Sequence, residues 1–159
     1  MEKKRSRGVT IFAWLSIIVN IFTLLTSLNF NTYFEMYKSF DKSIVMGIIL
    51  ISLFSIIVGI VAGFGILKLK EMMRKIVVVI NSFDVLFGIL LLLLSIDSFK
   101  QYAYSLAVAQ VGTKGNVLGI DTLTNIGFYT MIFVSLFYIA ISLLFIFFFT
   151  RPKVKEQFK

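Results

Sequence analysis

The chain alternates four long apolar stretches with short polar segments. The apolar stretches cover residues 8–28, 44–67, 76–96 and 126–150, and none shows the period-2 alternation of a half-exposed strand. Each is long enough to cross about 30 Å of hydrocarbon, which takes about 20 apolar helical residues. The pattern predicts an all-α, polytopic membrane protein: a single domain built as a bundle of four transmembrane helices.

The two segments that join spans one to two and three to four also carry local patterns. Asp41 or Ser43 is expected to cap the second span, because short polar side chains accept hydrogen bonds from the free amides at a helix start. In residues 97–125, apolar and aromatic residues recur at spacings of 3, 4 and 3: Phe99, Tyr102, Leu106 and Ala109. This spacing predicts a short interfacial helix in the second external loop, ended by the glycine-containing stretch 112–119.

Composition supports a membrane protein, and the distribution of charge orients it. The 159 residues are 58% hydrophobic and 15% charged, against about 45–50% and about 25% in soluble domains. Twelve of the 16 cations precede span one, separate spans two and three, or follow span four: Lys3, Lys4, Arg5, Arg7, Lys68, Lys70, Arg74, Lys75, Arg151, Lys153, Lys155 and Lys159. The positive-inside rule therefore predicts a cell-membrane protein with both termini in the cytoplasm.

The net charge of +8 is explained by this asymmetry, so no nucleic-acid partner is expected. The partners that the sequence favours are the lipid bilayer itself, anionic lipid headgroups at the cytoplasmic face, another copy of the chain or another membrane protein.

Asp84 is the exception within the apolar spans. It lies nine residues past Lys75, which places it about 13–14 Å from the cytoplasmic end of its helix, near the middle of the bilayer. A central Asp costs about 2.5–3.5 kcal/mol on insertion scales, so Asp84 must face protein or water and not lipid. Asn81, Gly88 and Ser95 fall on the same helix face, which therefore points inward.

Polar and small residues of the other spans complete a candidate site. Counting nine residues from the cytoplasmic cation of each span gives one layer: Ser16, Gly59, Asp84 and Ser142. The candidate intramembrane proton or ion site consists of Asp84, Asn81, Asn20, Ser16 and Tyr138. Small residues that allow close helix approach form a predicted packing seam: Ser55, Gly59, Gly63 and Gly88.

Two interpretations of Asp84 remain open at this point. In one it is a structural acid, neutral and hydrogen-bonded to Asn20, Asn81, Ser16 or Tyr138. In the other it is a water-exposed carboxylate that binds a proton or a cation on a transport path.

Three short motifs carry a resemblance to known proteins. They are Arg7-Gly8-Val9-Thr10-Ile11, the glycine-rich end of the second span at residues 63–70 (GFGILKLK), and the tail at residues 151–158 (RPKVKEQF). In these motifs and in its topology the chain resembles small uncharacterised prokaryotic four-helix integral membrane proteins. The resemblance implies a prokaryotic membrane and no established activity.

The chemistry of the side chains narrows the function classes. The chain has no Cys and no His, so disulfides, thiol catalysis and the commonest metal ligand are excluded, and no metal or cofactor is expected. A lone Asp lacks the second group that acid–base or nucleophilic catalysis needs, so we expect no enzyme. The favoured function is a non-catalytic accessory or interaction component of the membrane. The alternative is a small oligomeric transporter or channel that uses Asp84 as coupling carboxylate and the seam of Ser55, Gly59 and Gly63 as a subunit contact.

Overall fold

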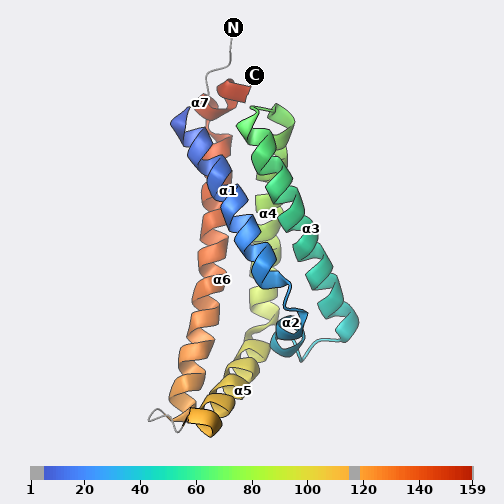
Figure 1. Ribbon diagram of the computed structural model, residues 1–159, viewed down its shortest axis with the longest axis vertical. Coiled ribbons are helices and arrows are strands. Elements are labelled where there is room, and N and C mark those ends of the chain that lie inside the picture. The colour runs from blue at the N-terminus through green and yellow to red at the C-terminus, as the bar shows by residue number, and fades with distance from the viewer. Residues whose placement is uncertain (1–5, 115–118, 159) are drawn as a thin grey trace.

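The computed structural model describes residues 6–114 and 119–158, and all regular elements in these ranges are helices (Figure 1). In chain order they are α1 (Arg7–Ser27), α2 (Phe30–Met36), α3 (Lys42–Leu67), α4 (Glu71–Leu94), α5 (Ile96–Lys114), α6 (Ile120–Thr150), α7 (Pro152–Lys155) and the 3-10 turn η1 (Glu156–Phe158). Four of them, α1, α3, α4 and α6, are long and apolar enough to cross a membrane. The described chain is thus an all-helical bundle with four helices that could span a membrane, which agrees with the four spans predicted from the sequence.

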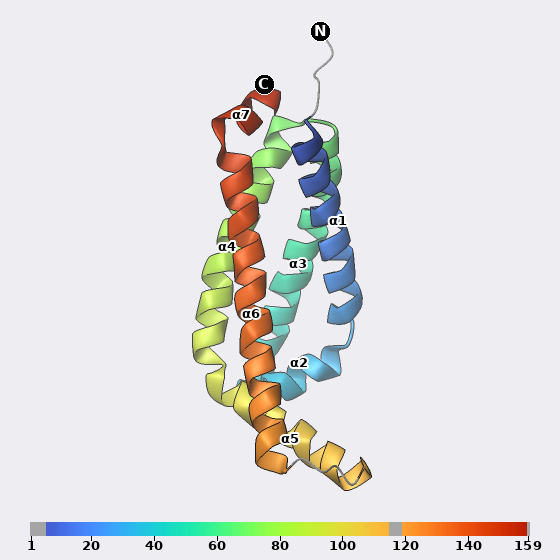
Figure 2. The same ribbon diagram turned by 90° about the vertical axis from the view of Figure 1, so that its left-hand side faces the viewer.

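The four long helices lie side by side, and α7 and the start of α1 meet at one end of the bundle (Figures 1 and 2). α1 packs along α3, α4 packs along α6, and the α3–α4 pair closes the bundle. α1 lies close to α6 at the end that carries α7 and diverges from it toward α2 (Figure 1).

Two of the long helices begin earlier than their apolar stretches. α4 begins at Glu71 and α6 at Ile120, whereas hydropathy predicts spans from 76 and 126. Hydropathy marks the part of a helix that matches the hydrocarbon, and a helix continues into polar residues wherever its amides remain bonded. At α3 the predicted cap is confirmed: Asp41 is the N-cap, and its carboxylate accepts a hydrogen bond of 2.9 Å from the Ser43 amide.

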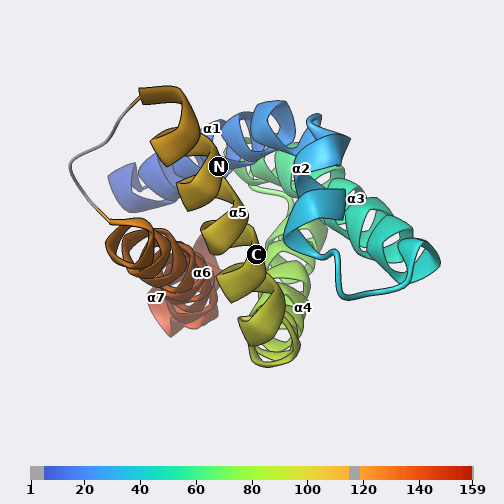
Figure 3. The same cartoon turned by 90° about the horizontal axis from the view of Figure 1, so that it is seen from below.

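The helix after α4 is longer than predicted and buries a different face. α5 runs on from α4 after Ser95, extends through Gly112 to Lys114, and lies across the far end of the bundle (Figure 3). It packs along α6 and buries Phe99, Ala103 and Ala107, while Leu106 of the predicted stripe is 41% exposed. The face with the small side chains is the buried one because it lets α5 approach α6 closely. A leucine on that face would prevent this approach.

The glycine-rich motif at the end of α3 makes a tight turn into α4. The amides of Lys70 and Leu69 donate to the carbonyls of Gly65 and Ile66, the double bond of a helix-ending Schellman turn. Leu69 takes the left-handed conformation, φ 51°, which a non-glycine residue adopts at some cost. A Cβ at Gly65 would overlap the side chain of Met73, so glycine lets α4 turn back against α3.

A buried cluster, the terminal core, fills the end of the bundle that carries α7. It contains Val9, Ala13, Ala62, Ile66, Val77, Phe145, Phe149, Val154 and Phe158. The last two belong to the tail, which folds back onto the bundle. The Ser6 amide also donates to Gln157 Oε1 at 2.9 Å, which ties the start of α1 to the tail.

A second cluster, the far core, lies at the opposite end. Tyr37, Val45, Ile49 and Phe99 form its buried part, so the aromatic segment around α2 packs inward against α3 and α5. Ser39 and Ser98 are hydrogen-bonded to each other across the α2–α5 contact. The volume between the terminal core and the far core is where the candidate site lies.

Candidate functional site

A small polar cavity occupies the middle of the bundle. Its walls include all five residues of the predicted site, contributed by α1, α4 and α6: Ser16, Asn20, Asn81, Asp84 and Tyr138. Gly59 and Ser142 also line it, so the predicted layer of four residues meets around one cavity. Its volume of about 30 Å³ is enough for a single water molecule.

Asp84 has a different hydrogen-bond donor from those predicted. The Ser55 hydroxyl of α3 donates to Asp84 Oδ1 at 2.8 Å, although the sequence assigns Ser55 to helix packing. The two amides bond within their own helices instead: Asn20 Nδ2 donates to the Ser16 carbonyl, and Asn81 Nδ2 to the Val77 carbonyl, both at 2.8 Å. The carboxylate is therefore held by one hydroxyl and keeps capacity for a further partner.

A much larger cavity, the chamber, adjoins the small one. It has a volume of about 410 Å³ and lies between the terminal core and the far core, with walls from α1 to α6. Asp84 and Tyr138 line both the small cavity and the chamber, and Ser55 lines the chamber. Asp84 is thus the acid at the boundary between the two spaces.

Part of the chamber wall reaches the surface of the bundle on α1 and α6. Phe22 of α1 is 68% exposed and Val134 of α6 is 59% exposed, and both line the chamber. Nearer to α7, Phe12 of α1 stacks on Phe148 of α6, with ring centroids 3.9 Å apart.

The remaining walls are apolar and aromatic, with hydroxyls between. The residues lining the chamber, all within the described part of the chain, include no Lys or Arg. At its far end burial, aided by Tyr33, raises the pKa of Tyr37 to about 12, so this phenol stays neutral and able to donate a hydrogen bond across the physiological pH range.

The three glycines of the predicted packing seam lie at contacts between helices of this chain. A Cβ at Gly59 would come within 2.7 Å of Asn20, and one at Gly63 within 2.6 Å of Ile17, so both glycines are where α3 meets α1. Gly88 of α4 faces Ile139 of α6. The expectation that Ser55, Gly59 and Gly63 form a subunit contact is therefore wrong, because α1 and α4 of the same chain occupy that face.

No family model, curated protein or solved structure matches the chain. Any functional conclusion therefore rests on the chemistry of the cavities themselves.

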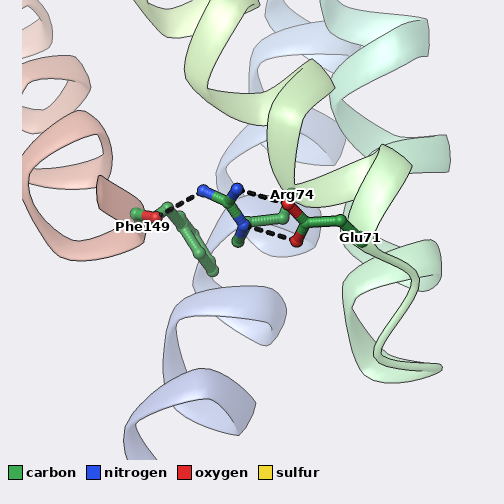
Figure 4. A network of polar contacts seen from close by, with 3 residues as sticks. All are labelled: Glu71, Arg74 and Phe149. Carbon is green, nitrogen blue, oxygen red and sulfur yellow. Dashed lines mark hydrogen bonds and ion pairs between the residues drawn. The ribbon is translucent and has the colours of Figure 1, made fainter. Parts of the chain in front are cut away.

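Sequence reasoning missed a second polar cluster, in the terminal core (Figure 4). Arg74, 6% exposed, makes two hydrogen bonds to the Glu71 carboxylate, at 2.6 and 2.7 Å, and its Nη1 donates to the Phe149 carbonyl of α6 at 2.8 Å. The sequence analysis counts Arg74 only as a cytoplasmic cation. The signal that it overlooks is the Glu71–Arg74 spacing of three residues, which pairs opposite charges on one helix face.

Proposed function

We propose that this chain is a non-catalytic protein of a prokaryotic cell membrane, with both termini in the cytoplasm, that binds a small, largely apolar molecule inside its bundle. In this role it is an accessory component that holds or presents a membrane-dissolved molecule. The single observation that carries the proposal is the chamber of about 410 Å³ beside Asp84.

The size and the walls of the chamber support binding. Small-molecule sites in proteins are cavities of about 300–1,000 Å³ with mostly apolar walls and a few fixed polar groups. The chamber has such walls, with Asp84 and Ser55 as a fixed polar pair. Its wall residues Phe22 and Val134 are exposed on α1 and α6, which suits a molecule that arrives through the lipid.

The test uses a neutral apolar probe, neopentylbenzene, with the protein in lipid nanodiscs. We expect saturable binding in equilibrium dialysis, above that of empty nanodiscs of the same lipid. Ser52→Phe places a ring in the chamber wall and should abolish this binding, whereas Gly47→Phe, on the same helix where nothing lies within 4 Å of a Cβ, should preserve it. Binding that stays linear with probe concentration would count against the proposal.

A second candidate function, a small transporter with Asp84 as proton- or cation-coupling site, is favoured by one observation: Asp84 borders both cavities. A coupling carboxylate needs contact with water and with the transported molecule. Infrared difference spectroscopy in lipid, with Asp84→Asn to assign the carboxyl band, tests this contact. The transporter predicts a band that changes with bulk pH; a band that stays constant from about pH 4 to pH 10 removes this candidate.

A further inference from the structure

The charge balance of the chamber is incomplete. Asp84 is the acid in its wall, Ser55 is its hydrogen-bond donor, and no Lys or Arg of the described residues lines either cavity. An ionised carboxylate in a mostly apolar site is costly until a cation joins it. Among the described residues, Arg74 supplies such a cation to Glu71, and none supplies one to Asp84.

The aromatic walls supply the other half of a recognition site. Six rings line the chamber, from α1, α2, α4, α5 and α6: Phe22, Tyr33, Tyr37, Phe87, Phe99 and Tyr138. The faces of such rings carry negative electrostatic potential and attract organic ammonium groups, while their area binds the apolar part of the same molecule. Tyr138 is shared with the small cavity, so an aromatic ring stands at the level of the carboxylate.

We propose that the ligand of the chamber is a lipophilic organic cation, with its ammonium group against the Asp84 carboxylate and its apolar part among the aromatic walls. This inference rests on the proposed function and adds the ligand's charge. Such a molecule reaches the chamber from the lipid past the exposed wall residues Phe22 and Val134. A mainly apolar chamber with one carboxylate selects for positive charge, since an anion would meet repulsion and a neutral molecule would leave the carboxylate with its Ser55 hydrogen bond but no cationic partner.

The experiment compares two probes of the same shape. Benzyltrimethylammonium carries a permanent positive charge, and neopentylbenzene replaces its nitrogen by carbon. Binding of both is measured by equilibrium dialysis against the whole chain in nanodiscs of zwitterionic lipid, with empty nanodiscs subtracted. We expect the cation to bind at least tenfold more tightly than its neutral counterpart.

Two substitutions test whether Asp84 causes the preference for the cationic probe over the neutral one. Asp84→Asn keeps the shape of the side chain, removes its charge, and should bring the two affinities within about twofold of each other. Asp97→Asn removes the same charge from α5, outside the chamber wall, and should leave the preference unchanged. Saturable neutral-probe binding by Asp84→Asn shows that this variant is folded.

The outcomes separate the two proposals. Equal binding of both probes by the unaltered chain would overturn the cation inference and leave the binding function standing. A cation preference that survives in Asp84→Asn would also overturn it, because the charge would then be recognised elsewhere. Absence of saturable binding for either probe would remove the binding function and the cation inference together.

Discussion

The two halves of the bundle are built from similar apolar residues and are packed in opposite ways. In the terminal core, all four long helices and the tail converge around Phe149 and Ile66, each 0% exposed, and each guanidinium nitrogen of Arg74 donates a hydrogen bond. Beyond Asp84 the helices part around a chamber of about 410 Å³. Hydrophobicity alone therefore does not decide packing in this protein.

The difference lies in the positions of small residues. Ala13, Ala62 and Gly63 let α1 and α3 touch near the terminal core, and close approach stabilises helix pairs in lipid through dispersion contacts. Toward α2, the facing residues are Thr23, Ser52 and larger side chains, which line the chamber. We infer that the terminal core carries the stability of the bundle and the far half carries its binding capacity.

The largest loss of stability is expected from Arg74→Met. This change preserves apolar packing but leaves the Glu71 carboxylate and the Phe149 carbonyl without their donor. Removing one partner of a fully buried pair costs about 3–5 kcal/mol; because Glu71 is about one-third exposed, we expect about 2–4 kcal/mol. The measurement is the denaturant midpoint of unfolding in micelles.

Lys75→Met is the matched control for this change. Lys75 is adjacent, exposed and equally charged, so its loss should shift the midpoint by less than about 0.5 kcal/mol. Similar midpoints for the two variants would mean that the Arg74 cluster does not hold the terminal core together.

The candidate site shows which features of this protein can be predicted from the sequence. The four spans, the inward face of Asp84 and the layer of Ser16, Gly59 and Ser142 all follow from period and depth, because both are properties of single helices. The donor to Asp84 does not, since Ser55 meets it only once α3 and α4 are placed side by side. The chamber could not be predicted from the sequence either. It depends on the angle between α1 and α6, which the residue pattern of a single helix does not determine.

Changes of intermediate size in the free energy of unfolding are expected when a methyl group is added to α3 at either of two glycines. Gly63→Ala places a Cβ about 2.6 Å from Ile17 Cγ1 and 3.4 Å from the Ala13 carbonyl, so α1 must shift, at a cost of about 1–3 kcal/mol. Gly47→Ala meets open space and should stabilise its helix by about 0.5–1 kcal/mol. A thermal midpoint that falls in Gly63→Ala and rises in Gly47→Ala would support the contrast in packing between the two regions. An unchanged midpoint in Gly63→Ala would show that the α1–α3 contact is loose.

The smallest effect is expected at the far half, where the Asp41 cap starts α3. Hydrogen bonds from the Ser43 hydroxyl and amide hold the pKa of Asp41 below its usual range. A carboxylate whose folded-state pKa is lowered stabilises the fold above its unfolded pKa, and this contribution is lost as pH falls through the folded value. Asp41→Asn keeps a good N-cap without the titrating charge, so the small advantage of the unaltered chain at pH 7 should vanish by about pH 2.

Glu35→Gln controls for this comparison, because it removes a negative charge from α2 without touching the cap. Its thermal midpoint should follow that of the unaltered chain through the acid range more closely than Asp41→Asn does. A gap between the unaltered chain and Asp41→Asn that is the same at pH 7 and pH 2 would show that the cap acts through shape alone.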